Sequence, residues 1–214
     1  PVREPDLIVE LEPELPPTDS EWFPPVVQEK RPFRPMFRLK TNLISWAGVM
    51  PWDFKHYSFV PNLELEWYFG RRFSVAGSAA YMKMTVGDDQ FFGIASYVVE
   101  PRFWFNGDGN FKWFYVGVYG QVGDFDNQNM RIDHFGKTGA FFGGGLSAGV
   151  MIPFGNRVGL ELGVRAGYYN RETDFYSYEA PNYYRDWTET DKKLGITGVK
   201  ASFVYRFGKG KNSK

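Results

Sequence analysis

Apolar and polar side chains alternate with a period of two through most of residues 37–207. In the segment NLELEW, residues 62–67, every second residue is apolar and the others are polar or acidic. The segment VGLELGVRAGYY, residues 158–169, repeats this pattern. A period of two sends successive side chains to opposite faces of an extended strand, whereas a helix repeats every ~3.6 residues. The sequence therefore predicts β-strands as the main elements.

Eight segments carry this alternation, some of them weakly. They are residues 37–45, 59–69, 73–85, 97–105, 113–122, 141–152, 158–169 and 198–207. Aromatic residues make up 19 % of the chain and there are 24 glycines, yet the mean hydropathy is only −0.39. This combination is typical of an all-β protein whose strands have one polar and one apolar face. We predict an eight-stranded antiparallel transmembrane β-barrel preceded by an extended Pro-rich arm.

The expected connections between the strands alternate in length. Residues 70–72, 106–110 and 153–156 are short turns, whereas residues 46–57, 86–92, 124–137 and 170–193 are longer polar and aromatic segments. Short turns at one rim and long loops at the other are typical of outer-membrane barrels. Aromatic residues also gather at strand ends, as in Trp67-Tyr68-Phe69, Phe103-Trp104-Phe105, Phe111 and Trp113, where membrane girdles lie.

Charged residues within the strands fall on one face. These residues are Lys40, Glu64, Glu66, Glu100, Arg102, Glu161, Arg165, Lys200 and Arg206. The predicted strands are long enough to cross a membrane at a tilt, which favours an apolar face toward the lipid. The charges then lie inside the barrel, where they must form ion pairs. We expect the pairs to close the lumen of so small a barrel. A soluble barrel with the faces inverted, and a narrow ion channel, remain as alternatives.

The composition changes near residue 36. Residues 1–36 hold 9 of the 14 prolines and have 8 acidic and 4 basic residues, whereas residues 37–214 have 17 acidic and 21 basic residues. Such a Pro-rich, charged segment cannot bury a core and favours an extended arm. Its apolar clusters predict docking on a partner. They consist of Leu7, Ile8, Val9, Trp22, Phe23, Val26 and Val27. Residues 208–214 form a short basic tail.

The composition also limits the chemistry. The chain has no cysteine and only two histidines, which excludes thiolate chemistry and a His-rich metal site. The zero net charge argues against nucleic-acid binding. We expect no cofactor, no metal and no catalytic residues. The chain begins at Pro1, which we interpret as a mature form after removal of an export signal.

Two alternatives would place a hydrolase active site or a calcium site in the loops. His134 with Asp133, Asp124 and Asp126, or His56 with Asp53, could activate water in a loop-based hydrolase. Residues 124–129 resemble the start of a calcium loop, but the glycine and the bidentate glutamate that such a loop needs are missing.

One rival to the barrel is a membrane helix over residues 138–156, which are uncharged and contain small-residue pairing patterns. Six glycines and Pro153 argue against it. In a small barrel, inward glycines make room for large neighbouring side chains.

The last predicted strand ends in alternating aromatic residues. Phe203, Tyr205 and Phe207 share one face and look like the carboxy-terminal signal by which outer-membrane barrels are recognised during insertion. The basic tail after Phe207 departs from a strictly terminal signal.

Several segments together resemble a family of Bacteroidota outer-membrane barrels catalogued only as a domain of unknown function. Its most specific pieces are Leu39-Lys40-Thr41-Asn42-Leu43 and Gly117-Val118-Tyr119-Gly120-Gln121, and the resemblance covers residues 37–207. It implies a small eight-stranded barrel with no established catalysis.

These observations lead to a functional hypothesis. We expect a non-enzymatic outer-membrane barrel that is an accessory or structural subunit of a larger complex, such as barrel-assembly or nutrient-uptake machinery. Its partners would be outer-membrane lipid and other outer-membrane or periplasmic proteins. With an even number of strands, both ends of the barrel lie at the short-turn rim, so the arm faces the periplasm and the long loops face the cell surface. A loop-based hydrolase and a narrow channel are the alternatives.

Overall fold

The computed structural model describes residues 36–47, 60–85, 90–107, 109–129, 135–179 and 182–207. The expected arm up to Pro35 and the basic tail, residues 208–214, lie outside this part of the chain. So do the seven residues expected to bind a partner, which are Leu7, Ile8, Val9, Trp22, Phe23, Val26 and Val27.

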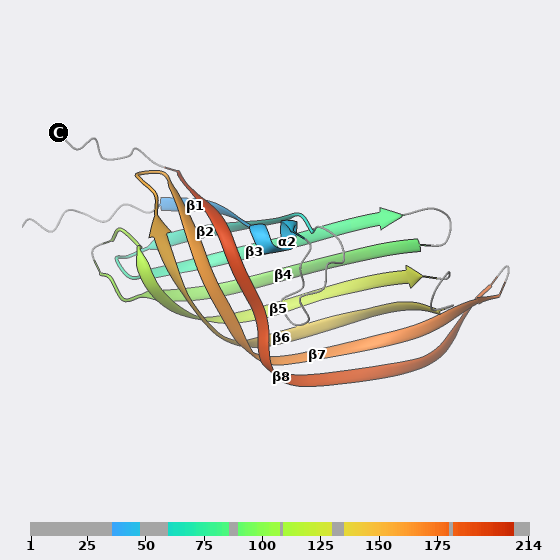
Figure 1. Ribbon diagram of the computed structural model, residues 1–214. Coiled ribbons are helices and arrows are strands. Elements are labelled where there is room, and N and C mark those ends of the chain that lie inside the picture. The colour runs from blue at the N-terminus through green and yellow to red at the C-terminus, as the bar shows by residue number, and fades with distance from the viewer. Residues whose placement is uncertain are drawn as a thin grey trace, which may run out of the picture. The chain divides into compact units, whose positions relative to one another are not determined.

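Eight antiparallel strands and one helical turn make up the described chain (Figure 1). They are β1 (Met36–Asn42), α2 (Leu43–Trp46), β2 (Asn62–Phe69), β3 (Phe73–Thr85), β4 (Gln90–Trp104), β5 (Trp113–Asn129), β6 (Phe135–Pro153), β7 (Val158–Glu179) and β8 (Asn182–Phe207). Each strand pairs with the next in the sequence, and β8 pairs with β1, so the sheet closes into a barrel. The predicted all-β fold of eight antiparallel strands is confirmed.

The structure overturns the helical alternative for residues 138–156. Residues 138–153 belong to β6, which pairs with β5 on one side and β7 on the other. Its glycines allow close approach of the neighbouring strands, and a Cβ at Gly145 would lie 2.2 Å from the carbonyl oxygen of Ala166. Among the described residues, no helix has the length and apolar character needed to cross a membrane.

The expected long loop over residues 170–193 is wrong, and two others, residues 86–92 and 124–137, are shortened at their ends, with residues 86–89 and 130–134 outside the described chain. β4 begins at Gln90, β5 runs to Asn129, and β7 and β8 together occupy nearly all of residues 170–193 as a paired hairpin. The period-two reading missed these extensions for two reasons. Polar and aromatic residues are mixed on both faces of the hairpin, so a regular apolar alternation is absent, and the register of β7 against β8 shifts between Arg165 and Ala166 and between Phe175 and Tyr176. Such a bulge reverses the phase of the alternation.

The first strand is shorter than expected. It ends at Asn42 rather than Ser45, because the Asn42 side chain accepts a hydrogen bond from the Ile44 backbone N–H at 3.2 Å and caps α2. Asparagine offers the backbone this local alternative to a ladder. Asn42 also exchanges hydrogen bonds with the Asn62 side chain, at 2.6 and 3.0 Å. This pair joins β1 to β2 where the helical turn begins.

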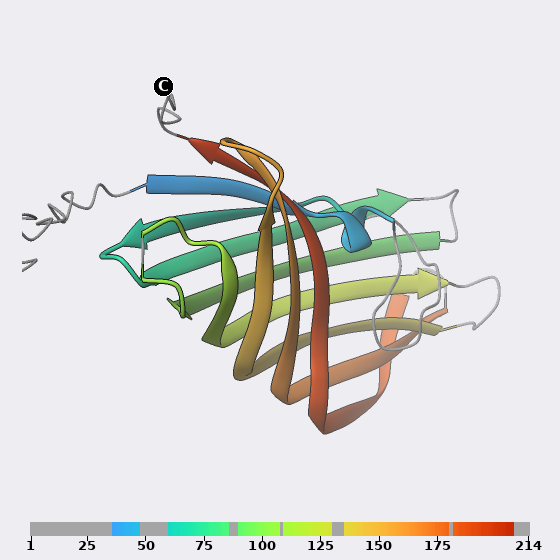
Figure 2. The same cartoon turned by 60° about the vertical axis from the view of Figure 1, so that its left-hand side comes forward.

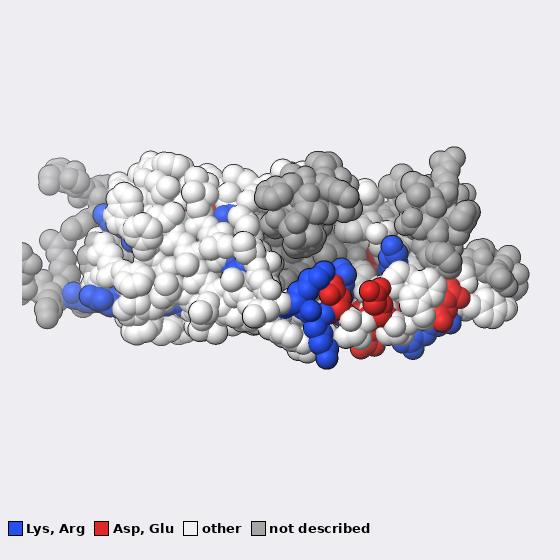
Figure 3. All heavy atoms as spheres, turned by 60° about the horizontal axis from the view of Figure 1, so that its bottom comes forward, with Lys and Arg blue, Asp and Glu red and all other residues white. Residues whose placement is uncertain are grey.

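The barrel wall separates its faces as the alternation predicts. In β2 the exposed fractions are 54 % for Leu63 and 49 % for Leu65 on the outer face, against 6 % for Glu64 and 0 % for Glu66 on the inner face. In Figure 3 the barrel wall on the visible side is mostly uncharged, while acidic and basic side chains gather toward the opposite end from the short turns. The polarity is therefore inverted relative to a soluble barrel.

The sheet extends beyond the closed part of the barrel. β1 pairs with β8 only over residues 202–207, and β7 is the one described strand that pairs with residues 182–201 of β8. Figure 2 shows β6, β7 and β8 bending sharply as they leave the closed part. We call residues 170–193 the outer hairpin. It projects from the rim opposite the short turns (Figure 1).

Candidate functional site

Four carboxylates and four cations fill the middle of the lumen. They are Glu64, Glu66, Glu100 and Glu161 with Lys40, Arg102, Arg165 and Lys200. We call this group the central plug. Seven of the eight residues are buried and Arg165 is half-buried. The plug carries equal numbers of positive and negative groups, as buried charges require.

Lys40 joins three carboxylates. Its ammonium lies 3.0 Å from Glu64 Oε1 and also contacts Glu66 and Glu161. One oxygen from each of these three glutamates lies within 4.8 Å of the others, a spacing that could hold a metal ion. Here the Lys40 ammonium supplies the positive charge that a metal would bring. The donor set therefore fits an ion-pair plug better than a metal centre.

Arg102 contacts all four carboxylates of the plug. Its Nη2 lies 3.0 Å from Glu64, its Nε 2.7 Å from Glu100, and its Nη1 3.2 Å from both Glu66 and Glu161. Its planar fork suits this role because it offers five donors in fixed directions. Gly117 makes room for it, since a Cβ there would lie 3.3 Å from Arg102 Cγ and 2.6 Å from Ser147 Oγ.

Arg165 and Lys200 complete the plug on its outer side. Arg165 Nη2 lies 2.5 Å from Glu100, and its guanidinium stands 5.5 Å from the Tyr119 ring centre. Lys200 Nζ lies 2.5 Å from Glu161 and 3.3 Å from Glu64.

Hydroxyl groups satisfy the remaining acceptor positions. Tyr68 donates to Glu66, Ser74 donates to Glu66 at 2.5 Å, Tyr115 donates to Glu161 at 2.9 Å, and Ser147 donates to Glu100 at 3.0 Å. Within the described chain, no plug side chain has a buried polar atom without a partner. The plug is thus a fully connected polar network, which holds a lumen closed and rigid.

An aromatic layer seals the lumen on the short-turn side of the plug. It consists of Tyr68, Trp104, Phe111, Tyr115, Met151 and Val204. Tyr68, Trp104 and Phe111 were expected in a membrane girdle, and the structure corrects this. Tyr68 and Trp104 point inward because they are the middle residues of aromatic triplets and so lie on the opposite face from their neighbours. Phe111 enters from the turn with φ = 50°, an uncommon backbone angle for a bulky residue.

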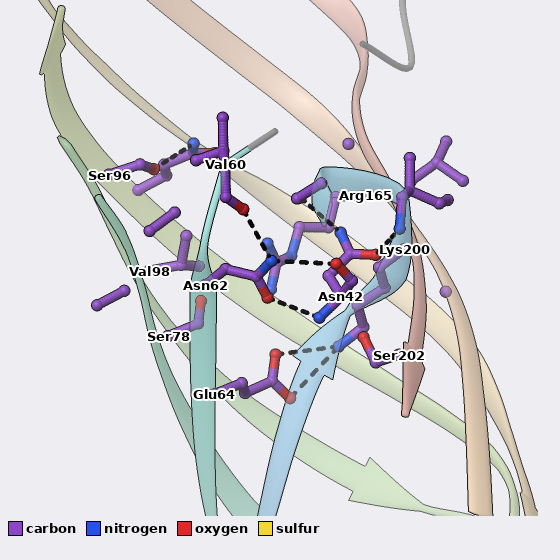
Figure 4. A pocket seen from close by; sticks show the side chains of 18 of the residues that line it. Asn42, Val60, Asn62, Glu64, Ser78, Ser96, Val98, Arg165, Lys200 and Ser202 are labelled. Carbon is purple, nitrogen blue, oxygen red and sulfur yellow. Dashed lines mark hydrogen bonds and ion pairs between the residues drawn. The ribbon is translucent and has the colours of Figure 1, made fainter. Parts of the chain in front are cut away.

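A cavity of about 190 Å³ with a mixed polar and apolar lining lies on the outer side of the plug (Figure 4). Glu64, Arg165 and Lys200 of the plug line it, together with Asn42 and Asn62. A second cavity of about 190 Å³ lies at the short-turn end and shares no lining residue with the first. The plug and the aromatic layer lie between the two.

Two arginines differ from the sequence expectation. Arg206 was expected among the interior ion pairs, but the structure gives it no carboxylate partner in the described chain, and it lines the short-turn cavity instead. It lies two residues beyond Val204 of the aromatic layer, which separates it from the plug. Arg38 is buried and was left out of the expected set, although the alternation places it on the same face as Lys40.

The other sequence candidates fall in different places. Phe203, Tyr205 and Phe207 lie on the outer face with exposed fractions of 36–48 %. His56, His134, Asp53 and Asp133 lie outside the described residues. Residues 124–129 are the end of β5, paired on both sides, and so do not form the compact loop that calcium needs.

The outer hairpin carries its own polar contacts. Asp174 accepts hydrogen bonds from Thr188 at 2.6 Å and from Arg185, which lower the pKa of its carboxyl. Arg171 pairs with Asp191 at 3.3 Å across the hairpin. The Tyr176 hydroxyl donates to Asp126 of β5 at 3.0 Å, and burial followed by the Asp126 charge raises its pKa. The first contacts join the two strands of the hairpin, and the Tyr176–Asp126 hydrogen bond ties the hairpin to β5.

The pieces that carried the family resemblance are structural parts of this interior. Lys40 lies in the plug, Asn42 caps α2, Gly117 leaves space for Arg102, and Gln121 donates to Ser96 at 3.1 Å. A family model described as "Protein of unknown function (DUF3575)" matches residues 34–207. This confirms a family of unknown function over nearly the range that the sequence indicated, while a Bacteroidota origin and an outer-membrane location stay predictions. No curated protein and no solved structure matches the chain.

Proposed function

Because the chain belongs to the family described as "Protein of unknown function (DUF3575)", which brings no activity with it, we propose a function from the geometry of the barrel. The protein is a non-enzymatic outer-membrane barrel with a closed lumen. It serves as an accessory or structural subunit of a larger outer-membrane assembly. It acts through its surfaces rather than through its interior.

The inverted polarity of the wall carries the membrane part of the proposal. Large apolar side chains such as Leu65, Val118 and Leu146 are exposed on the outside, at 49, 56 and 67 %. The inside holds the charged plug. A protein in water would expose these aliphatic chains at a large cost, since burying one of them is worth about 1.5–3 kcal/mol. Lipid removes that cost and requires a closed sheet, which this fold has.

The extent of the apolar outer face suggests where the membrane lies. Along β7 the outward residues are apolar or aromatic up to Tyr168 and become polar from Asn170. On the paired strand β8, the change from polar to apolar outward residues comes at Leu194, the register partner of Tyr168. The membrane band then lies between these positions and the short turns. The outer hairpin projects on the cell-surface side, and the arm leaves from the periplasmic side.

The filled lumen argues for a structural role. The plug and the aromatic layer leave separate cavities on either side, so a solute would have to break several buried ion pairs to pass. A barrel with a filled lumen anchors its amino-terminal arm, and any protein bound to that arm, in the membrane. In this proposal, Leu7–Val9 and Trp22–Val27 of the arm bind a periplasmic or outer-membrane protein, and the barrel wall contacts lipid or a second barrel.

Heat-modifiability and conductance test the closed membrane barrel. The unheated detergent-solubilised protein should migrate differently from the boiled protein on a gel, and it should fractionate with outer membranes. In planar bilayers it should give no stable conductance steps, whereas a large open porin serves as the positive control. A soluble fraction, or regular conductance steps from the wild-type chain, would contradict the proposal.

Co-purification in mild detergent tests the accessory role. The full chain should co-purify with a defined membrane partner. Trp22→Ala combined with Phe23→Ala should lose that partner, while Val2→Ala, outside both apolar clusters of the arm, should retain it. Recovery of every partner by the double variant would show that the arm does not dock.

A further inference from the structure

The cavity at the short-turn end is strongly basic. Its charged lining residues are Arg38, Lys112, Arg157 and Arg206, and its remaining lining is polar or apolar. We call these four residues the basic mouth. They come from four separate parts of the chain, namely β1, the segments before β5 and β7, and the end of β8. Folding therefore gathers four positive charges around about 190 Å³ of space.

The described short-turn rim supplies no negative charge to this cavity. No carboxylate lines the cavity, and the described segments at this rim, residues 36–38, 69–74, 103–107, 109–113, 152–159 and 204–207, contain neither Asp nor Glu. Arg71 and Arg72 add two further cations to the same rim. The field at this end is therefore positive in the described part of the chain.

Arg38 is held in the wall of the cavity, and one of its three guanidinium nitrogens has no partner among the described residues. Its Nη1 donates to the Phe111 carbonyl at 3.0 Å and its Nη2 to the Asn110 carbonyl at 2.9 Å, and its guanidinium lies 4.7 Å from the Tyr68 ring centre. The residue is only 3 % exposed, and its Nε has no hydrogen-bond partner within the described chain. A buried unsatisfied donor in a native fold calls for a ligand or an ordered solvent molecule.

Arg38 and Arg206 are also direct neighbours across two strands. They are register partners on β1 and β8, and both line the cavity. Like charges placed directly opposite each other on one face destabilise a sheet. An anion between them would relieve that repulsion.

The plug cannot supply that anion. Arg38 is the register partner of Glu66 on β2, but the Glu66 carboxylate already contacts Lys40, Arg102, Tyr68 and Ser74. Phe111, Met151 and Val204 of the aromatic layer line the inner side of the cavity. Within the described residues, no carboxylate is therefore free to compensate the charge of the basic mouth.

We propose that the basic mouth binds a phosphate group at the short-turn end of the barrel. Guanidinium groups bind phosphate oxygens through charge-assisted and often paired hydrogen bonds, and a phosphate of charge near −2 would offset about half of the four surrounding positive charges. The phosphate is either free in solution or carried by a lipid headgroup of the adjacent leaflet. Binding to free phosphate does not depend on the membrane location proposed above.

Calorimetric titration with inorganic phosphate tests the site. The full chain is kept in a maltoside detergent, which has no phosphate of its own, at constant ionic strength. We expect saturable binding at one site per chain. Arg206→Gln should weaken it at least about tenfold, because it removes a charge-assisted contact. Arg38→Gln should do the same. Arg71→Gln, a rim cation that does not line the cavity, should bind like the wild type.

The fold of each variant is checked by the mobility of the unheated sample on a gel. Arg206 is only half-buried, so Arg206→Gln still tests the site if Arg38→Gln fails to fold. Native mass spectrometry with a short-chain phosphatidic acid separates the two phosphate sources. Binding at least about tenfold tighter than inorganic phosphate identifies a headgroup site, and similar affinities identify a free-phosphate site. Absence of saturable binding to both, or binding that Arg206→Gln leaves unchanged, would overturn the proposal.

Discussion

The central plug and the basic mouth lie in the same lumen but differ in charge balance. The plug has four carboxylates for four cations, whereas the mouth has four cations and no carboxylate in its lining. β1 supplies both regions from positions two residues apart, with Lys40 in the plug and Arg38 in the mouth. One inward face of a barrel is thus divided into a charge-balanced part that closes the lumen and a basic part that we propose binds phosphate.

The aromatic layer makes this division possible. Tyr68 is central to it, because its hydroxyl donates to Glu66 while its ring faces the Arg38 guanidinium at 4.7 Å. A buried ion pair is stable only when partners surround it, and an apolar layer prevents a cation from reaching carboxylates beyond it. Among the described residues, the positive charge on the short-turn side therefore has no carboxylate to balance it.

The largest expected effect comes from removing the arginine that contacts all four carboxylates. Arg102→Met should lower the free energy of unfolding by about 3–5 kcal/mol, because it leaves a buried negative charge uncompensated. The measurement is urea unfolding of the protein in lipid vesicles, followed by tryptophan fluorescence.

Arg206→Met in the mouth is the matched control for that change. In phosphate-free buffer it should change the unfolding free energy by less than about 0.5 kcal/mol or raise it slightly, since it removes a like-charge neighbour of Arg38. Equal losses in the two variants would show that the plug and the mouth are not distinct.

A double-mutant cycle sharpens the description of the plug. Arg165→Met alone and Glu100→Gln alone each break the pair that closes at 2.5 Å. The double variant should lose less than the sum of the two single losses, by about 0.5–3 kcal/mol, because residues in one network are coupled. Additive losses in vesicle unfolding would mean that the two groups do not interact in lipid.

Glycine substitutions test how tightly the plug is packed. Gly117→Ala should lower the unfolding free energy by about 1–3 kcal/mol, since its Cβ would lie 2.6 Å from Ser147 Oγ and 2.7 Å from the Pro101 carbonyl oxygen. Gly120→Ala on the same strand has no atom within 4 Å of its Cβ and should be neutral. If both variants unfold alike, the interior is looser than the structure shows.

The smallest expected effect is on the outer hairpin, which lies away from both regions. The hydrogen bond from Thr188, together with the one from Arg185, lowers the pKa of Asp174 below its ordinary value of 3.8. Its contribution to stability is therefore present above pH 3.8 and is lost as the pH falls through the lowered pKa. A carboxyl-carbon NMR titration should place the midpoint below 3.8, and Thr188→Val should raise it. A midpoint at or above 3.8 in the wild type would contradict the contact.

Sequence alternation predicted the parts of the fold that depend on local pattern. It gave eight antiparallel strands and an outward apolar face, because the side-chain period of an extended strand is two whatever its neighbours are. It failed at residues 170–193, where polar and aromatic residues are mixed on both faces and a bulge changes the phase. It also failed at Tyr68 and Trp104, since runs of consecutive aromatic residues hide which one points inward.

The sequence predicted which residues form the candidate site, but not how they pair. Eight of the nine charged residues expected inside do meet in the plug. The lumen of an eight-stranded barrel is so narrow that inward side chains come within contact distance of one another. The pairing itself depends on strand register and on glycines such as Gly117, which the alternation does not reveal. Arg38 lies two residues before Lys40, on the same face of β1. Extending the alternation of the first strand by two residues would have added it to the expected inward set.

The formation of strands with one charged and one apolar face follows from neighbouring residues and so can be read along the chain. Which charges compensate one another follows only from how the strands pair and close in space. Lys112, Arg157 and Arg206 are far apart in the chain, and closure of β8 on β1 brings them around the cavity that Arg38 lines. Coulomb interactions depend on distance in space and on what lies between the charges, so the unbalanced mouth could not be read from a net charge of zero.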